Sequence, residues 1–309
     1  MPPKNDDPRA GKPKQEEPHD KKPSAVPSKR KAKSNDAPAK APRRSARGAT
    51  AQPDPVTLVN HLISPKSLDS CRPRDEIEDV KNRGSDLRTY SSSTFSPFEE
   101  LMCAVILSRP ISHALGLRTI RTLLNDPYGF TTPKKIRDGG FESVIKAVNQ
   151  ARTQHRQKTA EELVILADAA VDHLGDGDED VTLERVQREC DHDWQKEKEM
   201  LRKHIKGLGK TGLDIFGRRI QAQWPALYPF ADQRTLSGLQ KLGLPGTAEE
   251  LKKLLDHHWA ELDTKGFEGN EDEKKRRVFV QVLERAIGVD LEGNADGVRA
   301  QATPGTDNN

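Results

Sequence analysis

The sequence is poor in cysteine, in aromatic residues and in long apolar runs, and each shortage narrows what the protein can be. Its 309 residues include only three cysteines, which are widely scattered: Cys71, Cys103 and Cys190. Thiols so few and so far apart predict neither a disulfide framework nor a paired-cysteine metal site. No apolar run approaches the roughly 20 residues of a membrane span, and the first residues lack the apolar core of a signal peptide. We therefore expect an intracellular protein that does not enter a membrane.

The N-terminal residues 1–55 differ in composition from the rest of the chain. They are rich in Pro, Lys, Ala and Ser and contain no aromatic residue or apolar periodicity, which predicts a disordered tail. Up to Thr50 the chain has 14 Lys and Arg against 6 Asp and Glu, although its overall net charge is only +3. Such a basic tail favours nucleic-acid attraction or nuclear import, and residues 29–33 with 43–44 resemble a bipartite import signal. The alternative is a tail that only keeps the protein in solution.

The folded body begins at Ser96, where the signals for a helix start are complete. Ser96 is followed by a proline and then, at the third helical position, by Glu99, which together form a capping box. Residues 101–107 are apolar nearly all round, which predicts a buried central helix. Further helices are expected at residues 111–124, from Thr132, and at 141–148, 154–174 and around 181–204. Residues 71–90 are polar and are expected to form a loop. No strand signal of any length occurs, so the body is expected to be all-α.

Residues 205–220, Ile-Lys-Gly-Leu-Gly-Lys-Thr-Gly-Leu-Asp-Ile-Phe-Gly-Arg-Arg-Ile, carry the most informative motif. A charged, helix-favouring run precedes it and an apolar helical face ends it, which predicts a helix, a tight glycine turn and a second helix. Two glycines a residue apart let the backbone adopt positive φ and approach a ligand closely. The second helix begins with unpaired amides and a dipole that favours an anion, so a phosphate is the expected guest. Without a cofactor fingerprint, that phosphate is expected to belong to a nucleic-acid backbone.

Two other phosphate-binding motifs compete for the same residues. Gly207, Gly209 and Gly212 fit the spacing of a dinucleotide-binding fingerprint, and Asp232 stands near the position of its ribose-binding acid. That motif needs a β-strand before the first glycine, whereas the preceding residues are charged and favour a helix. A P-loop would need glycine where His204 stands, so that interpretation fails.

Three segments together resemble the HhH-GPD superfamily of endonuclease III-like DNA glycosylases. They are residues 97–108, which resemble its first core helix, the glycine turn, and residues 224–232, which end at the aspartate that this family requires. Order and spacing agree from Pro97 to Leu244. The resemblance implies a two-lobed helix-hairpin-helix glycosylase fold. In it, residues 97–223 would form a six-helix barrel lobe, residues 56–96 and 224–291 a second helical lobe, and residues 292–309 a disordered tail.

The resemblance also implies a function, the removal of damaged or mismatched bases from double-stranded DNA. We expect the protein to be a monomer and, because of its basic tail, to be nuclear. In such enzymes the base is flipped into a pocket and its N-glycosidic bond is broken. Asp232 would stabilise the cationic transition state or activate the nucleophile. An N-cap for the following helix is the alternative role, and the two roles can coexist. The implied DNA contacts are Lys206, Gly207, Leu208, Gly209, Lys210, Thr211 and Arg109.

Three departures from the family pattern modify this expectation. The position of the nucleophilic lysine of bifunctional members holds Thr211, and Lys210, one residue earlier, points about 100° away on a helix. Schiff-base lyase chemistry is therefore not expected, and hydrolysis by an activated water fits better. Arg109 stands where many relatives insert a glutamine wedge, so it would stack, pair with the orphan base or touch phosphate. Three cysteines cannot ligate a [4Fe–4S] cluster, and no cofactor or metal is expected. The alternative function is a non-catalytic DNA-binding protein that keeps the fold.

Overall fold

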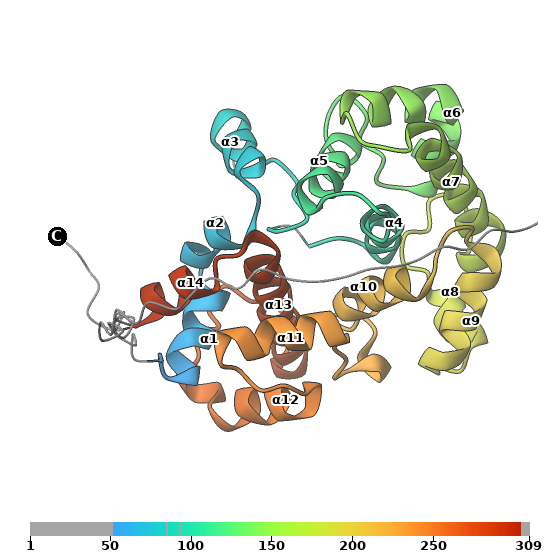
Figure 1. Ribbon diagram of the computed structural model, residues 1–309. Helices are drawn as coiled ribbons and strands as arrows, with labels where there is room; N and C mark the ends of the chain where they lie inside the picture. Colours follow the sequence, from blue (N-terminus) through green and yellow to red (C-terminus); the bar gives the residue numbers. More distant parts are fainter. Residues whose placement is uncertain (1–51, 85, 93, 304–309) are drawn as a thin grey trace, which may run out of the picture. The chain divides into compact units, whose positions relative to one another are not determined.

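This computed structural model describes residues 52–84, 86–92 and 94–303. The chain divides into one unit, Met1–Gly48, which lies outside the described residues, and a second, Ala49–Asn309. The predicted disordered tail falls almost wholly outside the described residues, as does the import signal. Within the described ranges all regular structure is helical (Figure 1), so the prediction of an all-α body is confirmed.

The helices follow one another along the second unit. In chain order they are α1 (Pro55–Ile63), η1 (Pro65–Ser67), α2 (Leu68–Cys71), α3 (Arg74–Arg83), α4 (Pro97–Leu107), α5 (His113–Leu124), α6 (Pro133–Gln150), α7 (Arg156–Ala169), η2 (Ala170–Leu174), α8 (Glu184–Glu189), α9 (Trp194–His204), α10 (Lys210–Ile220), η3 (Pro225–Leu227), α11 (Gln233–Leu242), α12 (Ala248–His257), η4 (Trp259–Glu261), α13 (Glu271–Glu292) and α14 (Ala295–Ala302). No helix in these ranges combines the length and the apolar character needed to cross a membrane.

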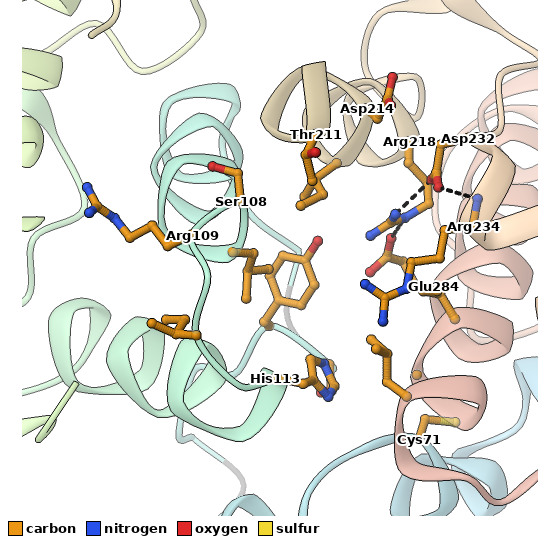
Figure 2. A pocket seen from close by; sticks show the side chains of 18 of the residues that line it. Cys71, Ser108, Arg109, His113, Thr211, Asp214, Arg218, Asp232, Arg234 and Glu284 are labelled. Atoms are coloured by element: carbon orange, nitrogen blue, oxygen red, sulfur yellow. Dashed lines mark hydrogen bonds and ion pairs between the residues drawn. The ribbon is translucent and has the colours of Figure 1, made fainter. Parts of the chain in front are cut away.

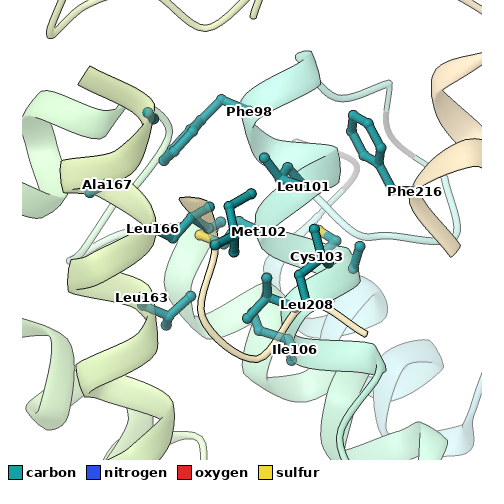
Figure 3. Close-up of a cluster of buried hydrophobic side chains, with 14 of the residues drawn as sticks. Phe98, Leu101, Met102, Cys103, Ile106, Leu163, Leu166, Ala167, Leu208 and Phe216 are labelled. Carbon is teal, nitrogen blue, oxygen red and sulfur yellow. The ribbon is translucent and has the colours of Figure 1, made fainter. Parts of the chain in front are cut away.

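Helix α4 is the centre of the first hydrophobic cluster. The predicted capping box is present, since the Ser96 amide donates to Glu99 Oε2 at 2.9 Å and the Glu99 amide donates to Ser96 Oγ at 3.4 Å. Every residue from Pro97 to Ile106 is buried. Figure 3 shows α4 side chains packed against α7 and against Leu208 and Phe216. The glycine turn therefore rests directly on the core.

A second hydrophobic cluster surrounds α13. Its buried members come from α1, α2, α11, α12, α13 and α14 and from the loops beside them. Val278, Phe279 and Val282 of α13 are fully buried in it. The first cluster draws instead on residues from Tyr90 to Trp224. The lobe boundaries predicted from the sequence stay predictions.

The loop expected at residues 71–90 is wrong, because residues 74–83 form α3. This helix has few apolar residues and is held to α5 by charge. Arg121, 2% exposed, donates to Glu76 at 3.0 Å, to Asp75 at 3.0 Å and to Asp79 at 2.9 Å. An ion cluster leaves no apolar periodicity in the sequence, which explains the missed helix.

Two further segments differ from the sequence expectation. The separate helices expected from Thr132 and at residues 141–148 form one element, α6, which is interrupted at Gly140, where φ is +60°. The tail expected from residue 292 contains α14, whose Val298 is fully buried in the second cluster. Residues 304–309 lie outside the described ranges.

Candidate nucleic-acid interface and pocket

The glycine turn joins α9 to α10. Gly207 adopts φ +85°, a left-handed conformation that glycine tolerates best, and Leu208, 4% exposed, inserts into the first cluster. Gly209 then caps α10 with extended backbone and no side-chain hydrogen bond. A helix, α9, precedes the turn, so the β-strand that a dinucleotide-binding fingerprint needs is not there. That alternative is therefore excluded.

The outer face of the turn is open to solvent and carries positive charge. Lys206, Gly207, Gly209, Lys210 and Thr211 are all exposed. The first amides of α10 have no intrahelical acceptor, and no side chain in the described part of the chain caps them. Lysines beside such amides suit an anion such as a phosphate. Leu208 can contribute to such a contact only through its backbone, because its side chain is in the core.

Arg109 does not project from the surface as the expectation of a DNA contact requires. Its guanidinium is buried in an ion pair with Glu162 of α7, and its side chain is 8% exposed. Figure 2 shows it directed away from the other labelled side chains of the pocket. Glu162 lies directly under the turn, because a Cβ added to Gly207 would stand 2.8 Å from Oε2 of Glu162. Arg109 therefore balances a carboxylate beneath the turn.

A pocket of about 500 Å³ lies beside the first turn of α10 (Figure 2). Its walls come from the end of α4, the start of α5, the inner face of α10, the start of α11 and the C-terminal half of α13. Four predicted site residues line it, namely Arg109, Lys210, Thr211 and Asp232, whereas residues 206–209 do not. Basic side chains outnumber acidic ones on the walls, which suits a guest that carries a phosphate.

Asp232 caps α11, as the N-cap interpretation predicted. Its Oδ1 accepts from the amides of Arg234 and Thr235, each at 3.1 Å. Its Oδ2 accepts from Arg218 Nη1 at 2.9 Å and from Thr235 Oγ1 at 2.7 Å. Four donors occupy the roughly four acceptor positions of a carboxylate. Burial alone would raise the pKa of Asp232, but the Arg218 charge and these hydrogen bonds outweigh it and hold the pKa below its ordinary value.

Arg218 links Asp232 to a buried ion network under the pocket. Its Nε donates to Glu284 of α13 at 2.5 Å, and Glu284 also accepts from Arg219 at 3.4 Å. Arg219 in turn donates to Glu100 of α4 at 2.6 Å. Burial would raise the pKa of Glu284, yet Arg218 and Arg219 hold it below its ordinary value. The network joins α4, α10 and α13, and so fixes the walls of the pocket relative to one another.

Lys210 is not suited to act as an amine nucleophile here. Its ammonium pairs with Asp214 at 2.8 Å, and its side chain is 89% exposed. The hydrogen bond that Lys210 donates to Asp214, together with the charge of Asp214, raises the pKa of Lys210, so the amine stays protonated at neutral pH. A Schiff base needs the neutral amine.

Several residues of the pocket had no sequence signal. Arg218 lies in the motif of residues 205–220, but there only the glycines and the apolar residues indicated a function or a fold. Glu284 lies among apolar residues that predict only a packed helix. His113, which pairs with Glu292, begins a helix and has no motif around it. Each becomes visible only through its partner on another helix.

No protein-family model, curated protein or solved structure matches this chain.

Proposed function

We propose that the protein is a DNA glycosylase-like base-excision protein that hydrolyses N-glycosidic bonds in double-stranded DNA, with Asp232 as its catalytic carboxylate. The observation that carries the proposal is that Asp232 lines the same pocket as Lys210 and Thr211, which open the helix after the glycine turn. A turn that grips one backbone phosphate would hold the adjoining deoxyribose at this pocket. The HhH-GPD resemblance of the sequence gives the same arrangement.

The pocket has the size that a flipped base requires. Its volume of about 500 Å³ falls in the range of small-molecule sites, roughly 300–1,000 Å³. Enzymes that act on a base inside a duplex extrude it into such a pocket. The base would enter beside α10, while its phosphate stays on the exposed face of the turn.

The contacts of Asp232 define the role it would play. Its lowered pKa keeps the carboxylate ionised at neutral pH, and two backbone amides fix its position. A fixed anion beside the sugar stabilises the positive charge that develops as the glycosidic bond breaks. Because its acceptor positions are occupied, Asp232 would act through its charge. With Thr211 at the lysine position and Lys210 protonated, the proposed chemistry is hydrolysis without strand cleavage.

The test is glycosylase activity on a panel of duplexes that each carry one uracil, oxidised or alkylated base, with alkali used to nick abasic products. We expect strand breaks only after alkali and no covalent trapping on abasic DNA by sodium borohydride. Asp232→Asn, which keeps the size of the side chain, should lose turnover and keep DNA affinity. Wild-type turnover in Asp232→Asn would contradict the role of this carboxylate.

A non-catalytic DNA-binding protein is the second candidate, and the Arg218–Asp232 ion pair favours it. A guanidinium 2.9 Å from Oδ2 weakens the field that the carboxylate exerts on a sugar. In that case the wild-type protein would bind the duplexes and release no base. Asp232→Asn would then lower DNA affinity, because it removes the ion pair with Arg218 that joins α10 to the start of α11, and neither protein would release a base. For both candidate functions we propose the nuclear location and the monomeric state that the sequence analysis expects.

A further inference from the structure

The proposed hydrolysis needs a group that removes a proton from water, and Asp232 is badly placed to do so. Both of its oxygens already accept two hydrogen bonds, and its pKa is lowered. A carboxylate in that state is a weak base. Another group on the walls of the pocket must therefore take the proton.

We propose that His113, oriented by Glu292, is the general base that deprotonates the attacking water, an inference that rests on the function proposed above. His113 is the first residue of α5 and lines the pocket. Its Nδ1 lies 2.9 Å from Oε1 of Glu292, the last residue of α13. The two side chains are 18% and 22% exposed, so both are held in place and still reachable by water.

The pairing decides which ring nitrogen can act. An ionised carboxylate only accepts hydrogen bonds, so the proton of the neutral imidazole must be on Nδ1. Nε2 then carries the free lone pair, and it makes no hydrogen bond to any residue that the structure describes. A base whose far nitrogen is oriented by a carboxylate is the arrangement used to activate water or a hydroxyl.

His113 and Asp232 come from different walls of the one pocket (Figure 2). Asp232 stands at the start of α11 beside α10, and His113 stands where α5 meets the end of α13. A sugar in the pocket would have the anion on one side and the histidine on another. In this arrangement Asp232 stabilises the positive charge on the sugar, and His113 accepts the proton of the water.

Besides His113 and Asp232, the charged or titratable groups on the walls of the pocket are Cys71, Tyr90, Arg109, Lys210, Asp214, Arg218, Arg234, Glu284 and Arg285. Burial raises the pKa of Cys71 to about 11, so this thiol is neutral at physiological pH. The partner in hydrogen-bond contact with His113 is Glu292, which lies outside the Arg218–Glu284 network.

The water oxygen bonds to the anomeric carbon while the bond from that carbon to the base breaks. The electron pair of the broken bond leaves with the base. One proton of the water passes to Nε2 of His113, and the resulting imidazolium is stabilised by Glu292. That proton then passes to the departing base directly or through solvent. The products are an abasic deoxyribose and a neutral free base.

The test compares His113→Gln, Glu292→Gln and, as a matched control on an exposed histidine, His257→Gln. Single-turnover rates of base release are measured against pH on a duplex from which the wild-type protein releases the base, and DNA affinity is measured separately. We expect His113→Gln to slow base release by at least about 100-fold, the usual contribution of a general base. The variant should keep DNA affinity and lose the rise of rate with pH. Glu292→Gln should be slowed less, and His257→Gln should match the wild-type protein.

Chemical rescue distinguishes a general base from a side chain that only holds α5 against α13. Added imidazole should restore part of the rate of His113→Ala if His113 is a general base, and should restore none if its role is structural. If His113→Gln melts below the assay temperature, Glu292→Gln carries the test, and an unchanged rate there overturns the inference. A wild-type rate and pH profile in folded His113→Gln would overturn it while leaving the proposed function intact. A wild-type protein that releases no base from any duplex of the panel overturns both.

Discussion

Replacing each glycine of the turn by alanine separates its internal packing from its contact with DNA. Gly207 has φ +85°, and an added Cβ would stand 2.8 Å from Oε2 of Glu162. Gly209 has φ −92°, and its added Cβ would meet no atom of the described residues within 4 Å. Because the same methyl group is added two residues apart, each variant is the control for the other.

The two substitutions should differ in their effect on stability. A left-handed conformation costs a residue with a side chain about 1–2 kcal/mol. Glu162 must also shift against its buried ion pair with Arg109, and breaking such a pair outright costs about 3–5 kcal/mol. With partial displacement, Gly207→Ala should lose about 2–4 kcal/mol of unfolding free energy. Gly209→Ala should change it by less than about 1 kcal/mol, since a stiffer unfolded chain offsets a poorer N-cap.

The two substitutions should affect DNA affinity in the opposite order, so that Gly209→Ala lowers the affinity more than Gly207→Ala does. The methyl group of Gly209→Ala occupies the open space beside the first amides of α10, where a phosphate would approach. We expect its affinity to fall at least about tenfold, or about 1.4 kcal/mol. Urea titration followed by circular dichroism gives the stabilities, and fluorescence anisotropy on a duplex with an abasic-site analogue gives the affinities. Wild-type affinity in Gly209→Ala would refute phosphate binding at the turn, and wild-type stability in Gly207→Ala would refute its packing on Glu162.

Three further predictions concern charged residues. Lys210→Ala should lower DNA affinity and reduce the slope of log affinity against log salt by about 1, with the rate of base release from bound DNA unchanged, in anisotropy and single-turnover assays. Burial raises the pKa of Glu197 from its ordinary value of 4.5 to about 7, because the folded protein favours the neutral carboxyl. The contribution of Glu197 to the free energy of unfolding is therefore complete below pH 4.5 and is lost as the pH rises through 7. Urea titrations should therefore find Glu197→Gln equal to the wild-type protein below pH 4.5 and more stable above pH 7. Arg121→Met should cost about 3–5 kcal/mol and speed amide exchange in α3, whereas Arg74→Met on the exposed face of α3 should do neither.

Helices that depend on residues a few positions apart could be predicted from the sequence. The start of α4 follows from Ser96 and Glu99, which contact each other directly. The turn between α9 and α10 follows from two glycines, a charged helix before them and an apolar helical face after them. Helix α3 was missed because its anchor is Arg121, more than 40 residues further along the chain. Local patterns therefore identify elements that carry their own signals and miss elements that a distant charge holds in place.

The pocket shows the same limit more sharply. The resemblance indicated Asp232 and the turn, and Asp232 lines the pocket together with Lys210 and Thr211, which follow the turn. Its other polar groups depend on pairs such as His113 with Glu292, which are 179 residues apart. Arg109 was expected to contact DNA because of its position in the sequence, and its partner Glu162 is on another helix. Neither the pairing nor the burial that results can be inferred from one member alone.

The two interpretations of Asp232 differ in what they require of its partners. An N-cap needs only the two amides of α11, and those bonds are present. Arg218 and the Thr235 hydroxyl are additional, and together they fill the second oxygen. A carboxylate so occupied keeps its charge over a wide pH range and loses its capacity to bind a proton. If the protein releases bases from DNA, its rate should therefore follow the titration of another group, and a rate that instead followed Asp232 in the acid range would show that the Arg218 pair opens when DNA binds.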